Sequence, residues 1–365
     1  MMRRFFKRIL TKPVTWLANK FSSRPNLQRV LTALTKLYKD SLENPGKKGL
    51  VIDTNVAGAR FIIFSDQHKG AKNGSDDFAF AEPTYMSALE YYLQQHYHFI
   101  SLGDEEELWE NLVGPVKEKN KASIELQKKF LLQSRYTKVF GNHDIFWNND
   151  PFAGLQLKSM YDQDVKIYEA VLLRIAMGEK VLPIFLTHGH QGDGQSDANP
   201  FSAWFVGRVW APLQCYLGIN LNVPSANDHL KTAHNLFMYQ WSKDDNHPVL
   251  ITGHTHQPVF ASFTQLERLY RKYETATTAN DELTIAALKK QIRFQQNEYD
   301  YVLGNYAKMK PYYFNSGCCC FSDGDITGIE IVDGFIRLIK WQTKTGLAER
   351  VLLEEMELGE LLQAV

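Results

Sequence analysis

Short apolar runs alternate in the first part of the chain with longer stretches of helical periodicity. Residues 60–65, 98–102 and 136–140 are apolar runs of strand length. Residues 76–97 and 117–134, which lie between them, carry apolar side chains at helical spacing. This alternation predicts an α/β fold in which helices cover a buried sheet.

The strand pattern returns in the second half of the chain. The apolar runs 182–187 and 249–252 predict two more buried strands. Residues 312–321 and 326–341 predict antiparallel strands, with Asp333-Gly334 as a hairpin turn in the second segment. Length alone allows one large domain or two average ones.

Two segments interrupt this plan. Residues 191–248 are aromatic-rich and lack a strand pattern, which predicts either an apolar cap over a site or a self-contained helical patch. The aromatic side chains expected to form the cap are Phe201, Trp204, Phe205, Trp210 and Tyr216. Residues 262–310 are highly charged and helical with a break near 277–280, which predicts a helical hairpin insertion.

The N-terminal segment differs from the rest in charge. Lys plus Arg and Asp plus Glu each total 41, yet residues 1–39 hold ten Lys or Arg and no acid. We therefore expect a basic helical arm over residues 1–45, attached to an acidic body. Within it, residues 1–24 form an amphipathic pattern that suits either an anionic membrane surface or packing on the acidic body.

The composition and charge of the chain argue against several classes of protein. The zero net charge and the acidic body disfavour a nucleic-acid partner, because phosphate-backbone binding needs a positive track. No apolar run reaches the ~18 residues of a membrane span, and the N-terminus does not match a signal peptide. Cys215 and the run 318–320 lack zinc-site spacing and are expected to be free thiols. Together these features predict a cytoplasmic protein, with peripheral attachment to the inner face of the membrane as the role open to the arm.

Five polar blocks carry the candidate chemistry, and each follows one of the predicted strands. They are Asp66-Gln67-His68, Gly103-Asp104, Gly141-Asn142-His143-Asp144, His188-Gly189-His190 and Gly253-His254-Thr255-His256. Ligands collect at the carboxyl ends of strands in open α/β folds. Carboxylate, imidazole and amide donors suit divalent ions such as Mn, Fe or Zn, and two ions ~3.5–4 Å apart can hold the attacking and leaving oxygens of a phosphoryl displacement.

Other polar residues receive structural interpretations. Isolated histidines are more often core or surface residues than ligands, and we interpret five in this way: His96, His98, His229, His234 and His247. His190 is expected near the site without an assigned role. Glu105 and Glu106 are expected to form a solvated acidic edge.

In order and type, the five blocks resemble the calcineurin-like metallophosphoesterases over about residues 60–260. The resemblance implies a four-layer α/β/β/α sandwich spanning residues 58–345, and two divalent metal ions, with Mn favoured over Fe or Zn. It also implies attack by a metal-bridging hydroxide on a phosphate ester or anhydride.

The resemblance also implies a role for each matching residue. The first ion would be held by Asp66, His68, Asp104 and His256. The second would be held by Asp104, Asn142, His188 and His254, with Asp104 as the bridge. His143 would meet the substrate phosphate and protonate the leaving oxygen, and Asp144 would orient His143.

A closer resemblance comes from residues 103–109, Gly-Asp-Glu-Glu-Glu-Leu-Trp. They are similar to the Gly-Asp-x-x-Glu-x-Trp pattern of UDP-2,3-diacylglucosamine pyrophosphatases, and residues 205–212 resemble the cap helix of that family. The chain departs from the family in carrying His143 where Arg is typical, and in its hairpin insertion. This resemblance implies an amphipathic nucleotide-lipid substrate.

The leading expectation is therefore hydrolysis of a phosphoanhydride or phosphodiester in a phosphorylated small-molecule or lipid-linked substrate. The alternatives are a protein or small-molecule phosphomonoesterase and a non-catalytic scaffold on the same fold. No peptide-groove signature favours the first alternative. The scaffold is disfavoured because such proteins usually lose metal ligands or the catalytic His.

Overall fold

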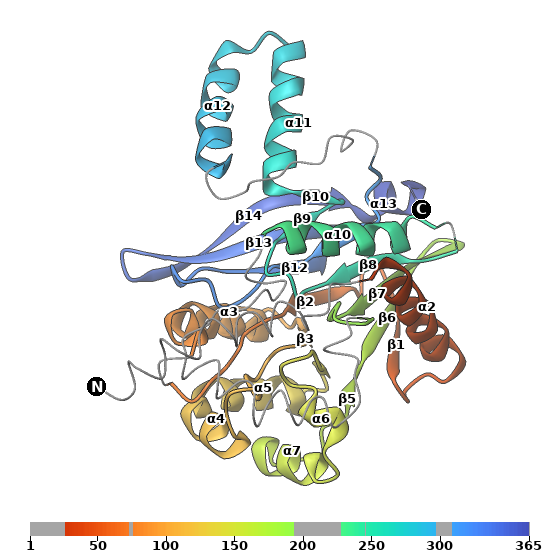
Figure 1. Ribbon diagram of the computed structural model, residues 1–365, viewed down its shortest axis with the longest axis vertical. Coiled ribbons are helices and arrows are strands. Elements are labelled where there is room, and N and C mark those ends of the chain that lie inside the picture. The colour runs from red at the N-terminus through yellow and green to blue at the C-terminus, as the bar shows by residue number, and fades with distance from the viewer. Residues whose placement is uncertain (1–25, 73–75, 193–227, 245, 297–308, 365) are drawn as a thin grey trace, which may run out of the picture.

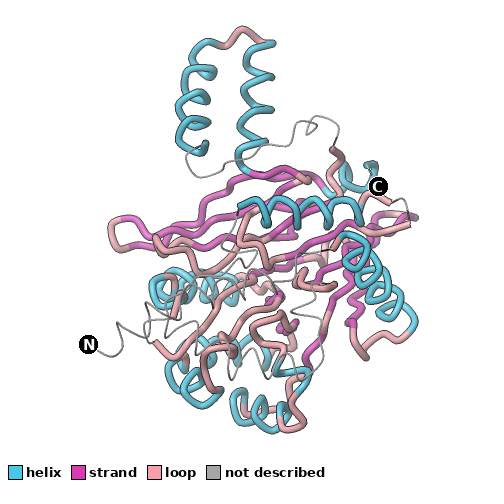
Figure 2. The backbone as a smooth tube through the Cα atoms, in the orientation of Figure 1, coloured by secondary structure: helices cyan, strands magenta, loops and turns pink. Residues whose placement is uncertain are grey.

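The computed structural model describes residues 26–72, 76–192, 228–244, 246–296 and 309–364. Its fold is mixed α/β and is built on two seven-stranded sheets (Figures 1 and 2). The predicted fold class is confirmed at this level. The arm residues 1–24 and the greater part of the predicted cap, 193–227, lie outside the described residues.

In one sheet, the predicted strands that precede the first three polar blocks are parallel neighbours. Its strands, in spatial order, are β14 (Leu347–Glu357), β13 (Phe335–Lys344), β12 (Ile326–Val332), β2 (Arg60–Phe64), β3 (His98–Leu102), β4 (Tyr136–Val139) and β5 (Ile167–Tyr168). Phe61 pairs with His98 and Phe99 pairs with Tyr136. Because β2, β3 and β4 run in parallel, the segments that follow them meet at one edge of the sheet.

The second sheet brings the other two blocks together. Its strands, in spatial order, are β1 (Gly49–Asn55), β6 (Ala170–Met177), β7 (Lys180–Thr187), β8 (Val249–Thr252), β11 (Tyr313–Asn315), β9 (Val259–Phe260) and β10 (Phe263–Thr264). β7 and β8 are parallel, with Ile184 opposite Val249. The backbone NH of Gly253 donates to the carbonyl of His188 (3.0 Å), so the segments after these strands are joined directly.

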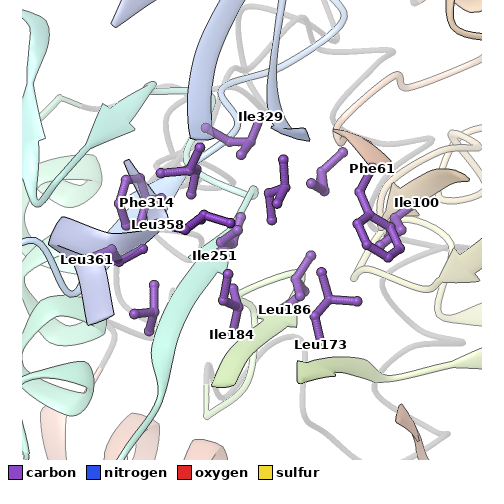
Figure 3. Packing of buried hydrophobic residues seen from close by; sticks show 14 of the residues in the cluster. Phe61, Ile100, Leu173, Ile184, Leu186, Ile251, Phe314, Ile329, Leu358 and Leu361 are labelled. Carbon is purple, nitrogen blue, oxygen red and sulfur yellow. The ribbon is translucent and has the colours of Figure 1, made fainter. Parts of the chain in front are cut away.

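The two sheets share a buried aliphatic core. Leu173, Ile184 and Ile251 from the second sheet belong to one cluster with Ile100 and Ile329 from the first (Figure 3). Burial of this apolar surface is the main contribution to the free energy that holds the two sheets together. The edges that carry the five blocks are thereby fixed relative to each other.

Helices pack on the face of each sheet that points away from this shared core. The helices near the first sheet are η1 (Phe78–Phe80), α3 (Glu82–Gln94), α4 (Val113–Lys119), α5 (Lys121–Leu132), α6 (Phe146–Asn149) and α7 (Ala153–Tyr161). Tyr85 and Tyr92 of α3 and Phe130 of α5 are buried in one cluster with Phe64 and Phe99 of the strands. This matches the predicted helices over 76–97 and 117–134.

The N-terminal part of the fold extends further than the sequence pattern predicts. Val30 and Leu34 of α2 (Leu27–Glu43) are buried against the second sheet, so this half of the predicted arm is part of the globular body. α10 (Asp228–Ser242) lies within the predicted cap, yet its Met238 and Trp241 belong to the same buried cluster. The apolar faces of these two helices belong to one buried cluster with Phe185, and α10 also contacts a polar block through His234 and the Gly189 carbonyl.

The charged segment after β10 contains two helices that pack on each other. α11 (Gln265–Thr278) and α12 (Glu282–Gln296) share a small cluster that includes Leu269 and Leu288. Thr264 and Glu267 form a capping box at the start of α11. Figure 1 shows both helices projecting from the sheets, and the short helix α13 (Leu358–Ala364) ends the chain. No helix among the described residues is long and apolar enough to cross a bilayer.

Candidate metal centre

The ligand-type residues sit on strained backbone where the strands end. Asp66, His68, Asp104, His254 and His256 all have positive φ, between 50° and 68°. Non-glycine residues rarely adopt this left-handed conformation, and such strain concentrates at functional sites. Backbone hydrogen bonds hold the turns in place, including Asp66 N–H to the Gly103 carbonyl and His68 N–H to the Asp104 carbonyl, both 3.0 Å.

Three glycines in the blocks are required by close approach, and a Cβ at Gly103 would lie 2.5 Å from Nδ1 of His188. A Cβ at Gly141 would lie 2.2 Å from Oδ1 of Asp104, and a Cβ at Gly253 would lie 2.4 Å from Oδ2 of Asp66. Neither residue has positive φ, whereas Gly103 does (87°). Glycine at 141 and 253 therefore makes room for the carboxylates, and at 103 it allows the turn.

The first predicted half-site is assembled from three strand ends. Nε2 of His68 lies 3.1 Å from Nε2 of His256 and 3.9 Å from Oδ1 of Asp66, and that oxygen is 3.2 Å from His256 Nε2. Oδ2 of Asp104 lies 3.8 Å from His68 Nε2. The backbone NH of His254 donates to both oxygens of Asp66, at 2.9 Å to Oδ2 and 3.2 Å to Oδ1, and so holds the carboxylate beside the two imidazoles.

The second predicted half-site lies on the other side of Asp104. Nε2 of His188 is 3.1 Å from Oδ2 of Asp104 and 3.2 Å from Oδ1 of Asn142. His188 Nδ1 donates to the carbonyl of Leu102 (3.0 Å), so its Nε2 is the nitrogen that faces the site. Donor atoms of Asp104, His188 and His254 all lie within 4.8 Å of one another.

These residues suit divalent ions. His254 is buried, and its Nε2 has no hydrogen-bond partner among the described residues. A buried imidazole nitrogen without a partner costs free energy unless something fills the gap. Burial, followed by the charges of His234 and His188, holds the pKa of His254 well below its usual range, so its lone pair is available to an ion. The structure thus brings together all seven residues predicted as ligands.

His143 stands beside the first half-site, and its ring is held by Glu107. Nδ1 of His143 lies 2.6 Å from Oε2 of Glu107, and the indole of Trp109 stacks on the ring at 3.9 Å between centroids. The same Glu107 oxygen lies 3.0 Å from Nδ1 of His68. Burial alone would lower the pKa of His143, but the charges of Glu107 and Asp104 raise it to about 9.

The residue predicted to orient His143 has another role. The Asp144 carboxylate accepts from the backbone NH of Gly141 (2.6 Å) and of Glu105 (3.0 Å). It therefore joins the loop after β4 to the loop after β3. Burial, as the largest influence, raises its pKa to about 7. The orienting role expected of Asp144 therefore belongs to Glu107. The motif 103–109 contained this signal, but spacing could not show which acid reaches the imidazole.

The expected acidic edge at Glu105 and Glu106 is wrong. Both side chains are buried and ion-paired with Lys138, whose Nζ lies 2.9 Å from Oε1 of Glu106. Lys69, the residue after His68, pairs with Glu105 at 2.8 Å. A buried carboxylate is retained only where it is paired, and here the two lysines supply the partners. This ionic cluster adjoins the candidate ligands along the chain, because Lys69 follows His68 and Glu105 follows Asp104.

Two further histidines adjoin the second half-site. His190 is buried, and burial lowers the pKa of its ring to about 3. Nε2 of His234 lies 2.6 Å from the carbonyl of Gly189, and its ring is 5.1 Å from that of His254. His234 was expected to be a structural residue. Its hydrogen bond to the loop between His188 and His190 agrees with that expectation.

Comparison with known proteins gives little further guidance. No protein-family model and no curated protein matches the chain. Solved structures with detectable likeness include vacuolar protein sorting 29 from Cryptosporidium parvum, at 12% identity and a TM-score of 0.32, covering 82% of this chain and 99% of that one. A single mutant of Vps29 from Entamoeba histolytica has 14% identity and a TM-score of 0.28, covering 81% and 99%. Likenesses this remote carry no argument about activity, so the functional conclusion depends on the residues of the site itself.

Proposed function

We propose that the chain is a dinuclear metal-dependent phosphoesterase that hydrolyses a phosphoanhydride or phosphodiester. It would do so on a four-layer α/β/β/α metallophosphoesterase sandwich that carries a helical hairpin insertion. The proposal assigns Asp66, His68 and His256 to the first ion, Asn142, His188 and His254 to the second, and Asp104 to both.

The position of Asp104 is the observation that carries this proposal. Its Oδ2 is close to both sets of nitrogen donors, 3.8 Å from His68 Nε2 and 3.1 Å from His188 Nε2, and Asp104 belongs to two groups of potential ligand atoms. Its Oδ1 accepts from the backbone NH of His143 (2.8 Å), which fixes the carboxylate in that place. A shared anion between two donor sets is what a pair of cations at close range requires.

Two divalent ions bound here would activate water as a nucleophile and neutralise charge on a substrate phosphate. The described side chains supply the remaining function. Glu107 holds Nδ1 of His143, which leaves Nε2 as the ring nitrogen available to the leaving oxygen. The nearby carboxylates raise the pKa of His143 to about 9, which favours the protonated ring that a general acid needs.

The substrate class is the finer part of the proposal. Glu107 and Trp109 are the distinctive residues of the motif 103–109, and both contact His143. The motif therefore forms part of the surface next to the proposed general acid. The resemblance of this motif to that of the nucleotide-lipid pyrophosphatases is what favours a nucleotide-lipid substrate with an apolar end. The basic segment 1–24 would bring the enzyme to an anionic membrane surface, a proposal that rests on sequence alone.

The test is a hydrolysis screen with metal-depleted protein reconstituted with Mn²⁺. Nucleotide-diphospho-lipids, simple phosphomonoesters and bis-aryl phosphodiesters would be compared, with ions per chain measured in the same samples. Release of product from an anhydride or diester, dependent on added Mn²⁺ and lost in D104N, supports the proposal. Two bound ions without hydrolysis of any substrate would favour a scaffold, and preference for monoesters would favour a phosphatase.

A further inference from the structure

A sulfur atom lies beside the first half-site, in a place that the five blocks do not predict. Sγ of Cys320 is 3.8 Å from Nδ1 of His256. Donor atoms of His68, His256 and Cys320 all lie within 4.8 Å of one another, which is the spacing of a possible ion site. Cys320 comes more than 50 residues after the last block, so no sequence spacing could connect it to the histidines.

The segment that carries Cys320 is anchored to the metal loops. It follows β11, and the backbone NH of Cys319 donates to the carbonyl of Asp66 (3.1 Å). The hydroxyls of Ser316 and Ser65 lie 2.7 Å apart, and the backbone NH of Ser316 donates to the carbonyl of Thr252 (2.9 Å). These bonds fix the cysteine run against the strand ends that hold Asp66 and His254.

The consecutive cysteines occupy different surroundings. Cys319 is fully buried in the apolar cluster under α3, and its Sγ lies 3.9 Å from the carbonyl of Thr327. Cys320 is only partly buried and faces His256. Cys319 therefore serves packing, whereas the sulfur of Cys320 lies in one group of potential ligand atoms with His68 and His256.

We propose that Cys320 provides a sulfur donor to the ion held by Asp66, His68 and His256. This inference rests on the metal centre of the proposed function. On binding, the thiol loses its proton to solvent and the sulfur joins the ion in its place. Thiolate ligands favour Zn²⁺ over Mn²⁺, so Cys320 shifts the metal preference of this centre away from manganese.

The test is spectroscopic and uses the full chain, stripped of metal under reducing conditions and titrated with Co²⁺. Thiolate bound to Co²⁺ gives a charge-transfer absorption that nitrogen and oxygen ligands do not give. We expect this absorption in the wild type, in C318S and in the matched control C319S, and its loss in C320S. In competition, C320S should also lower the affinity for Zn²⁺ relative to Mn²⁺ by about tenfold or more, since even indirect partners of a metal are worth that much.

The outcomes separate the two proposals. Absorption that persists in C320S, or that disappears in C318S instead, shows that Cys320 is not the donor. Two bound Co²⁺ ions without the absorption in the wild type would also remove the sulfur donor while leaving the metal centre intact. A wild-type chain that binds no Co²⁺ would overturn the centre itself, and with it the proposed function.

Discussion

Oε2 of Glu107 lies 2.6 Å from Nδ1 of His143, and the same oxygen lies 3.0 Å from Nδ1 of His68. One carboxylate thus connects the proposed general acid to a proposed ligand of the first ion. Burial would raise the pKa of Glu107, but His143, as its strongest partner, and His68 lower it to about 2, so Glu107 is ionised at neutral pH.

Removing that charge should change the pH dependence of hydrolysis. The Glu107 carboxylate raises the pKa of His143, so E107Q should lower that pKa and move the alkaline fall in kcat to lower pH. We expect kcat at neutral pH to fall by ~10-fold or more, with two ions retained. The exposed substitution E118Q is the control. A pH profile that does not move would show that Glu107 is structural only.

Replacing His143 itself should affect substrates according to their leaving groups. H143A should lower kcat by ~10²–10⁴, the range for a lost general acid, with metal content unchanged. The loss should shrink for aryl esters whose leaving oxygens need no proton. Equal losses across a leaving-group series would assign His143 to positioning the phosphate instead.

The buried ionic cluster should contribute strongly to stability. Lys138 is fully buried between Glu105 and Glu106, so K138M leaves two carboxylates without their shared partner. We expect the free energy of unfolding in urea to fall by ~3–5 kcal/mol. The matched control is K158M, at a lysine that is largely exposed in its pair with Asp164 and should matter by less than ~1 kcal/mol. Similar values for both variants would contradict the role given to the cluster.

His98 should make folding sensitive to acid. Burial lowers the pKa of its ring to about 4 in the folded chain, against an ordinary value of 6.5. Between these values the unfolded chain binds the extra proton, so this contribution to stability is complete above pH 6.5 and is lost as pH falls toward 4. In H98Q, where the amide can still bond Thr137, the free energy of unfolding should depend less on pH in this window. Parallel pH curves for both proteins would refute this assignment.

The sequence predicted which candidate ligands the fold brings together because those residues follow strands. The parallel pairing of β2, β3 and β4 places Asp66, Asp104 and Asn142 at one edge, as periodicity implied. The sequence pattern could not reveal the burial of Glu105, because its partner Lys138 is distant in sequence and only the fold brings the two residues together. Cys320 was missed for the same reason.

The edges of the fold were also hard to predict. β1 and β14 lie at sheet edges, and their side chains are mostly half-buried or exposed. Such strands lack the continuous apolar run that marks β2 or β8. The predicted domain span of 58–345 therefore leaves out β1 and β14, both of which belong to the sheets.

If Asp104 is shared by two ions, its replacement must lower the number of ions that each chain binds. Wild-type protein and D104N would be stripped of metal, loaded with Mn²⁺, freed of excess and measured by elemental analysis. Asparagine keeps the size of the side chain and an oxygen that can accept from the backbone NH of His143. We expect two ions in the wild type, at most one in D104N, and no hydrolysis by the variant. Two tightly held ions in D104N would contradict this expectation.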